Sequence, residues 1–187
     1  IENEHRIATQ EEQQILSGYV GWGGLSEAFD EKNGAWYNEY QKLKSLLSPE
    51  EYASARESTL NAHYTSPIII RSIYDTLGRM GFEKGNILEP SIGIGNFFGM
   101  LPERMQDSRL YGVELDSLTG RIAKQLYPKA EIQISGFEKT NHPKDFFDVV
   151  VGNVPFGQYK VADKPYDKHN FLIHDYFLAK SLDKVRP

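Results

Sequence analysis

The chain of 187 residues contains no cysteine. A disulfide scaffold, a thiolate metal site and a cysteine nucleophile are therefore excluded. No apolar run approaches the roughly 18 residues of a membrane span, and the first residues do not read as a signal peptide. We therefore expect a cytoplasmic protein. Hydrophobic residues make up 40% of the chain, with 10 Phe and 11 Tyr, which is enough for a folded core.

Excess positive charge is also missing. Residues 1–60 carry 11 acidic and 5 basic side chains, a net charge of −6, whereas residues 61–187 carry 15 and 16, a net charge of +1. A domain that binds DNA strongly by itself is usually more basic. If DNA is the substrate, we expect most phosphate contacts to come from elsewhere.

Residues 1–60 read as a helical N-terminal extension. Capping-box sequences at residues 9–12 and 48–51 each predict the start of a helix. Between them lies YVGWGGL, residues 19–25, whose three glycines indicate a tight turn. Two interpretations stay open: the turn packs Trp22 into the core, or it presents a surface to a cofactor or nucleic acid.

Residues 61–187 alternate short apolar segments with amphipathic helical ones. This alternation predicts a parallel, doubly wound α/β sheet. Only four strands are expected, the last at an open edge, so we expect a fragment that is incomplete at its C-terminal end. The expected strands are 86–89, 109–114, 131–135 and 147–152, and the expected helices are 66–80 (burying Ile69, Ile70, Ile73 and Leu77), 97–105, 117–127 and 171–185.

A glycine-rich segment, EPSIGIG, follows the first expected strand, where parallel sheets bind ligands. Gly93 and Gly95 allow close approach of a ligand to the backbone. A dinucleotide fingerprint would need a third glycine where this chain has Phe98, so the loop does not suit a pyrophosphate. Glu89 would repel such an anion and fits a cationic ligand better, such as the amino group of a methionine moiety.

Glu114 ends the second expected strand, 19 residues after Gly95. An acidic residue at about 20 residues' spacing is placed to bind both hydroxyls of a ribose. The spacing predicts a nucleoside-containing ligand.

Asn153-Val154-Pro155-Phe156 follows the last expected strand. The Asn153 side-chain oxygen and the Val154 carbonyl could both accept hydrogen bonds from one NH2 group, with Pro155 fixing the backbone. Phe156 offers a stacking face for a base. The sequence therefore indicates chemistry on an exocyclic or amide nitrogen.

Four segments resemble the motifs of the gamma-type adenine-N6 DNA methyltransferases and follow one another in the same order as in that family. They are HYTSP, LEPSIGIGNFF, GVELD and GNVPFG. The resemblance implies a Rossmann-like class I methyltransferase fold, S-adenosyl-L-methionine as cofactor and a flipped adenine of DNA as substrate. It also implies the site residues: Tyr64, Thr65, Glu89, Pro90, Gly93, Gly95, Glu114 and Phe137 for the cofactor, and Asn153, Val154, Pro155 and Phe156 for catalysis.

More narrowly, YVGWGGL and IHDYF, with these motifs, resemble very large phage, plasmid and conjugative-element proteins that join such a domain to a helicase. This resemblance implies covalently linked helicase and target-recognition regions outside this chain. There are two departures from the family pattern. Val154 replaces a usual proline, and Ser135-Gly136-Phe137 keeps an adenine-stacking ring but lacks the preceding acid, for which Glu138 is a candidate substitute.

The implied mechanism needs no covalent intermediate and no metal, and we expect none, since His174-Asp175 has no further ligand at metal-binding spacing. Without cysteine, cytosine-C5 methylation is excluded. Two alternatives stay open: a protein glutamine-amide methyltransferase and a non-catalytic nucleic-acid-binding module. The loop at 157–170 is either a lid over the substrate or a solvated loop.

Overall fold

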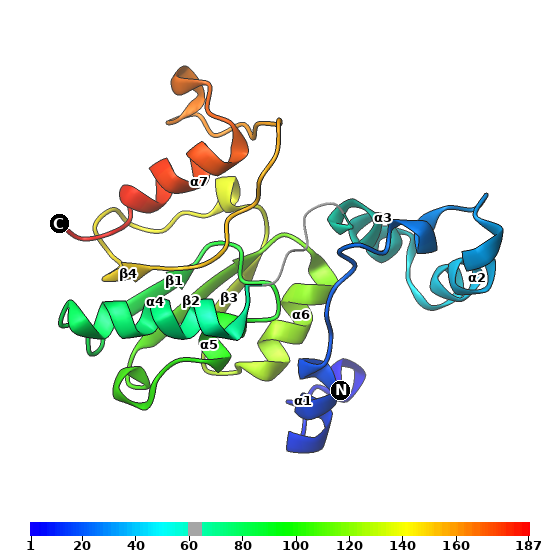
Figure 1. Ribbon diagram of the computed structural model, residues 1–187, viewed down its shortest axis with the longest axis horizontal. Helices are drawn as coiled ribbons and strands as arrows, with labels where there is room; N and C mark the ends of the chain where they lie inside the picture. Colours follow the sequence, from blue (N-terminus) through cyan, green and yellow to red (C-terminus); the bar gives the residue numbers. More distant parts are fainter. Residues whose placement is uncertain (60–64) are drawn as a thin grey trace.

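The computed structural model describes residues 1–59 and 65–187 (Figure 1). Its strands are β1 (Asn86–Glu89), β2 (Arg109–Glu114), β3 (Glu131–Ile134) and β4 (Val149–Val150). Its α-helices are α1 (Gln10–Ser17), α2 (Tyr37–Leu46), α3 (Pro49–Ser58), α4 (Pro67–Arg79), α5 (Asn96–Gly99), α6 (Ser117–Leu126) and α7 (Ile173–Leu182). Short 3-10 helices are η1 (Glu2–Glu4), η2 (Ser26–Phe29), η3 (Gly34–Trp36), η4 (Glu103–Met105), η5 (Phe137–Lys139) and η6 (Asp167–His169).

The strands in the described part of the chain form one parallel sheet in the order β3-β2-β1-β4. This confirms the predicted parallel α/β sheet. Beyond α7, Val185 forms a parallel bridge with Phe147, and the Arg186 N–H donates to the Phe147 carbonyl at 2.9 Å. The chain leaving α7 thus returns alongside the edge where β4 lies. β4 is shorter than the predicted 147–152, and Phe147 pairs with this returning segment.

Helices cover both faces of the sheet. Ile87 of β1 packs in a cluster with residues of α4 and α5, whereas its neighbour Leu88 packs with residues of α7. This alternation places α4 and α5 on one face of the sheet and α7 on the other (Figure 1). Both faces are buried, as a parallel sheet requires.

Two helix predictions need correction. The predicted helix 97–105 stops at Gly99, because Pro102 has no N–H to continue it and disfavours a helical conformation at Leu101. On α4, Ile69 is 52% exposed, and Tyr74, with 1% exposure, is buried instead. Ile69 lies one residue, about 100°, away from the stripe that faces the sheet.

The N-terminal helices form as their caps predict. Thr9 and Ser48 each complete a capping box, at the starts of α1 and α3. Trp22 packs edge-on against Phe29, with ring centroids 5.4 Å apart, in a separate small cluster around Ala55. Figure 1 shows α1 and the α2–α3 pair on different sides of α6. The predicted boundary between extension and sheet domain falls at residues outside the described part.

Candidate functional site

A cavity of about 550 Å³ opens beyond the carboxyl ends of β1, β2 and β4. This volume lies within the range of small-molecule sites, and the position is the ligand-binding edge of a parallel sheet. The structure brings most of the predicted site residues together here: Thr65, Glu89, Pro90, Gly93, Glu114, Phe137, Asn153, Val154, Pro155 and Phe156. Tyr64 lies outside the described residues.

Gly95 is not among the residues that line the cavity, and its contact with a ligand stays a prediction. Its φ of 89° is a left-handed conformation that favours glycine, and a Cβ at this position would collide with the Tyr127 ring. Gly95 is therefore needed for a turn and for the packing of Tyr127. Gly93 has a φ of 58° and open space where a Cβ would lie, so its backbone stays accessible from the cavity.

Glu89 is the most deeply buried ionisable side chain that lines the cavity. Its side chain is 3% exposed, and its Oε2 accepts no hydrogen bond from any described residue. Burial, and then the charge of Glu114, raise the pKa of Glu89 well above its ordinary value. A carboxylate left without a partner inside a cavity is a candidate partner for a cationic group of a ligand.

Glu114 holds the loops at the rim of the cavity. Its Oε2 accepts the Gly93 N–H at 2.8 Å, and its Oε1 accepts the Asp116 N–H at 2.8 Å. Burial raises the pKa of Glu114, and these hydrogen bonds oppose the rise. Each carboxylate oxygen keeps a further lone pair, so the side chain can still accept from hydroxyl groups.

Phe137 lines the cavity, but its ring is 2% exposed and packs against Phe177, with centroids 5.0 Å apart. The ring therefore forms part of the cavity wall, and little of its face is open for stacking. Ser135, Gly136 and Glu138 lie beside it on the cavity wall. Glu138 therefore stays a candidate for the missing acid.

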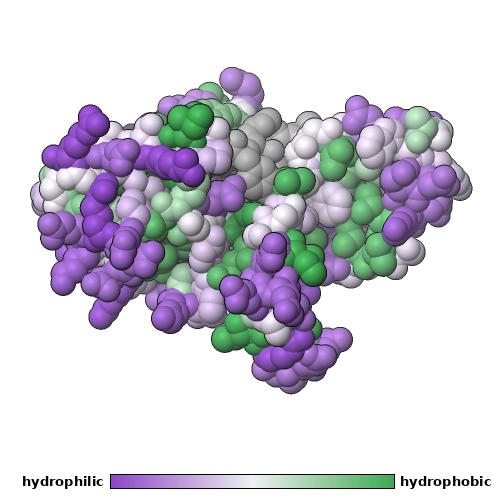
Figure 2. Space-filling view, turned by 60° about the horizontal axis from the view of Figure 1, so that its bottom comes forward, coloured by the Kyte–Doolittle hydropathy of each residue, from purple (hydrophilic) through white to green (hydrophobic). Residues whose placement is uncertain are grey.

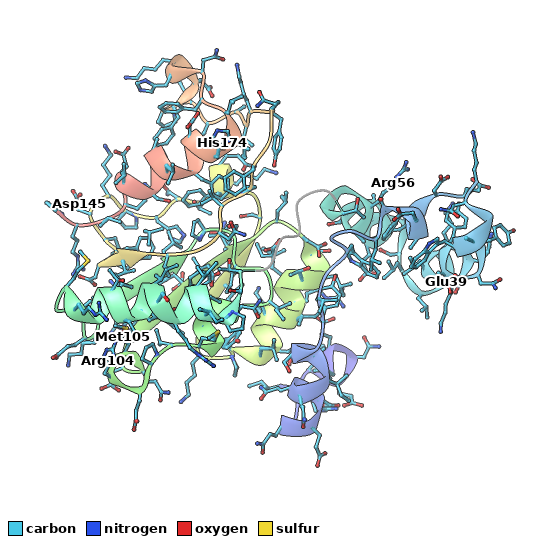
Figure 3. All side chains as sticks on the ribbon, in the orientation of Figure 1. Glu39, Arg56, Arg104, Met105, Asp145 and His174 are labelled. Atoms are coloured by element: carbon cyan, nitrogen blue, oxygen red, sulfur yellow. The ribbon has the colours of Figure 1, made fainter. Side chains whose placement is uncertain are left out.

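The predicted catalytic motif is joined to the glycine-rich loop. Ser91 Oγ donates to the Asn153 carbonyl at 2.6 Å. Phe156 is 62% exposed, and its ring centroid lies 6.1 Å from that of His174, with 30° between the ring planes. Figure 3 labels His174, at the start of α7. An exposed ring at a cavity mouth offers one face to a planar group.

The loop at 157–170 contacts the cavity through Tyr159 and Val161. Asp163 anchors it: Lys180 Nζ donates to Asp163 Oδ2 at 2.9 Å, and the Tyr176 hydroxyl donates to the same oxygen at 2.6 Å. Lys180 Nζ also donates to the Phe137 carbonyl at 2.7 Å. The loop is thus tied to α7 and to the segment after β3, although sequence patterns alone left its role open.

Sequence reasoning missed Ser54, which lines the cavity from α3, and left Gly21 undecided. The glycine-rich turn YVGWGGL was the sequence feature that could have placed Gly21 in the site. Nothing in the local sequence distinguishes Ser54.

Within residues 1–59 and 65–187, no helix is long and apolar enough to cross a membrane. Nor do three or more His, Asp or Glu side chains gather in these residues as a group that could hold a metal ion.

No protein-family model matches the chain. The chain is 32% identical over 184 residues to defense against restriction protein B of Escherichia phage P1, covering 96% of this chain and 7% of that protein. It is 34% identical over 104 residues to type II methyltransferase M.CvrRI of Paramecium bursaria Chlorella virus XZ-6E, covering 55% of this chain and 26% of that protein. The chain thus spans a small part of these curated relatives.

Two solved structures share the arrangement of elements. A putative class I S-adenosylmethionine-dependent methyltransferase from Listeria monocytogenes matches with a TM-score of 0.51 and 16% identity, over 84% of this chain and 57% of that one. A modification subunit of a putative type I restriction enzyme from Vibrio vulnificus matches with a TM-score of 0.53 and 17% identity, over 80% and 35%. The chain therefore has the α/β Rossmann-like fold of the class I S-adenosylmethionine-dependent methyltransferases.

Proposed function

We propose that this chain is a methyltransferase domain that transfers a methyl group from S-adenosylmethionine to N6 of adenine in DNA. The observation that carries the proposal is that one cavity joins Glu89 and Glu114 to Asn153 and Phe156. Residues suited to a nucleoside with a cationic amino group thus line the same space as residues suited to a flat amine. The names of the two curated relatives, a phage protein against restriction and a type II methyltransferase, support DNA as the substrate.

S-adenosylmethionine fits the chemistry of the cavity lining. The unpartnered Glu89 carboxylate suits the methionine ammonium, and Glu114 suits the ribose hydroxyls. Thr65 lies just before α4, whose N-terminal N–H groups favour a carboxylate. The ammonium and the carboxylate of the methionine moiety would thus each meet a group of opposite polarity.

In the catalytic step, the Asn153 side chain and the Val154 carbonyl accept hydrogen bonds from the two N–H bonds of the target amine. These bonds draw the amine out of conjugation with the ring and localise its lone pair. When bound, S-adenosylmethionine supplies the electrophilic methyl group on its sulfonium. The new N–C bond forms as the S–C bond breaks, and the amine's extra proton passes to solvent. Positioning of the amine supplies most of the acceleration.

Phe156 is proposed to stack on the adenine after it leaves the duplex. Its 62% exposure leaves the ring free to receive a base. We further propose that target recognition and a linked helicase lie outside this chain, which spans 7% of the phage relative.

Methyl transfer to unmodified double-stranded DNA tests the proposal. When incubated with the chain, the DNA should incorporate label from S-adenosylmethionine carrying a radioactive methyl group, and Asn153→Ala should lower this incorporation by roughly 100-fold or more. Calorimetry with S-adenosylhomocysteine should give the same affinity for both proteins. Full activity in Asn153→Ala would contradict the proposed role of Asn153.

A further inference from the structure

The N-terminal helices contribute to the wall of the cavity. Gly21, after α1, and Ser54, on α3, line it together with Asp116 and Thr119 at the start of α6. Ser54 Oγ donates to Asp116 Oδ1 at 2.6 Å, and the Asp116 N–H donates to Glu114 at 2.8 Å. Two hydrogen bonds thus connect α3 to the carboxylate proposed to hold the ribose.

This wall lies toward one end of the cavity. Ser54 bonds to Asp116, whereas Asn153 and Phe156 come from the loop after β4. Between Asp116 and Glu114, Leu115 also lines the cavity with its side chain 72% exposed. Ser54 therefore belongs to the end that receives the ribose and its base, away from the group that is transferred.

Arg121 of α6 holds the N-terminal helices against this end. Its guanidinium donates to Glu51 of α3 at 2.5 Å and to Glu2 of η1 at 2.8 Å. Hydrogen bonds from the Ser48 backbone and then from Arg121 lower the pKa of Glu51, and bonds from Arg121 lower the pKa of Glu2, so both carboxylates stay charged. One arginine thus bridges two separate elements to α6.

A second attachment lies one turn further along α6. The Ala8 N–H donates to Gln125 Oε1 at 2.8 Å, and Gln13 Nε2 donates to the Gln125 carbonyl at 2.8 Å. In Figure 2, the N-terminal helices project from the body of the molecule, with hydrophobic residues (green) among hydrophilic ones (purple). Specific contacts on α6 therefore set where these helices lie.

We propose that residues 1–59 form part of the cofactor site and close its adenosine end, with Ser54 contacting the bound cofactor and Arg121 acting as a positioning residue. This inference rests on the proposed use of S-adenosylmethionine. Cofactor binding and docking of the N-terminal helices on α6 are then coupled, so each strengthens the other. A change at Arg121, outside the cavity, alters cofactor affinity.

Protection of a single thiol tests the contact at Ser54. Because the chain contains no cysteine, Ser54→Cys introduces one thiol. S-adenosylhomocysteine at about 100 times its dissociation constant should slow the reaction of this thiol with a disulfide reagent by up to roughly 100-fold. Ser17→Cys, on the exposed surface of α1, is the matched control and should react at the same rate with and without the ligand.

Arg121→Gln tests the coupling. It should raise the dissociation constant of S-adenosylhomocysteine roughly 5-fold or more, and raise KM for the cofactor with kcat unchanged. Arg121→Lys should recover part of the affinity. Arg6→Gln breaks ion pairs to Glu4 and Glu12 within the N-terminal segment itself and should leave the affinity unchanged.

The outcomes separate the two claims. If the unmodified chain does not bind S-adenosylhomocysteine, the proposed function fails and this inference fails with it. If the chain binds the ligand but the thiol of the Ser54→Cys variant reacts at the same rate with and without it, the contact is wrong while the proposed function stands. If Arg121→Gln binds as tightly as the unmodified chain, the coupling is wrong.

Discussion

The Ser91 hydroxyl donates a 2.6 Å hydrogen bond to the backbone carbonyl of Asn153. Ser91 belongs to the glycine-rich loop after β1, and Asn153 to the loop after β4. The bond therefore joins the loop proposed to hold the methyl donor to the loop proposed to hold the acceptor. It holds the peptide between Asn153 and Val154, which lies between the two proposed acceptors of the target amine: the Asn153 side-chain oxygen and the Val154 carbonyl.

Ser91→Ala should slow methyl transfer more than it weakens cofactor binding. Loss of one hydrogen bond costs about 1 kcal/mol, and a small misplacement of the Asn153 peptide lowers kcat by roughly 10-fold or more. Single-turnover kinetics and calorimetry separate the two effects. An unchanged kcat with a large loss of cofactor affinity would show that Ser91 serves the cofactor alone.

Glu89→Gln should stabilise the ligand-free protein at alkaline pH. Because the folded pKa of Glu89 is raised, its contribution to stability is complete below the ordinary glutamate pKa and is lost as pH rises through the raised value. Glutamine removes this loss, worth roughly 1.4 kcal/mol for each unit of pKa shift. Urea unfolding at several pH values measures the free energy of unfolding of both proteins. If this free energy depends on pH in the same way in both, the expected stabilisation is contradicted.

The same carboxyl should release a proton when the cofactor binds. The ligand's ammonium favours the ionised form of Glu89 and lowers its pKa on binding. Calorimetry in two buffers of different ionisation enthalpy measures this proton, which Glu89→Gln should not release. The variant should also bind roughly 10- to 100-fold more weakly, since it loses a charged hydrogen bond. Equal proton release in both proteins would place the ammonium elsewhere.

Phe156→Ala should weaken DNA binding without destabilising the fold. Its ring is 62% exposed, so its loss should change the free energy of unfolding by about 0.5 kcal/mol at most. Stacking on a base contributes roughly 1–3 kcal/mol, so KM for DNA should rise between about 5- and 150-fold. Phe156→Trp keeps a stacking face and is the matched control. If tryptophan and alanine behave alike, stacking is not the role of this ring.

Lys180→Met should destabilise the protein strongly. The side chains of Lys180 and Asp163 are 4% and 11% exposed, and their ion pair anchors the loop that carries Tyr159. Removing the lysine leaves a buried carboxylate without its cation, at a cost of about 3–5 kcal/mol. Urea unfolding measures this cost. Adding Asp163→Asn should recover part of the stability; a purely additive double variant would argue against the pairing.

The strands of the sheet could be predicted where apolar runs end at turn residues, as for β1 and β2, whose bounds match. The parallel direction of the strands also followed from their alternation with helices. Local patterns failed where distant residues decide. Gly95 is constrained by Tyr127, which lies 32 residues later in the chain. The periodicity of the local sequence cannot predict such a contact.

The residues of the site could be predicted in part. Polar side chains lie at or just after the carboxyl ends of three strands: Glu89, Glu114 and Asn153. Because parallel strands end at the same edge of a sheet, it could be predicted that these side chains line one cavity. Ser54 could not be predicted, because its place depends on a hydrogen bond to Asp116, 62 residues away. Phe137 could be assigned to the cavity, but its burial against Phe177 depends on how α7 packs.

The identity of the methylated base distinguishes adenine-N6 transfer from other methylation of DNA. DNA is incubated with the chain and S-adenosylmethionine carrying a deuterated methyl group, then digested to nucleosides and examined by mass spectrometry. The account predicts labelled N6-methyladenine, absent when Asn153→Ala replaces the unmodified chain. Label found in cytosine and not in adenine would contradict it.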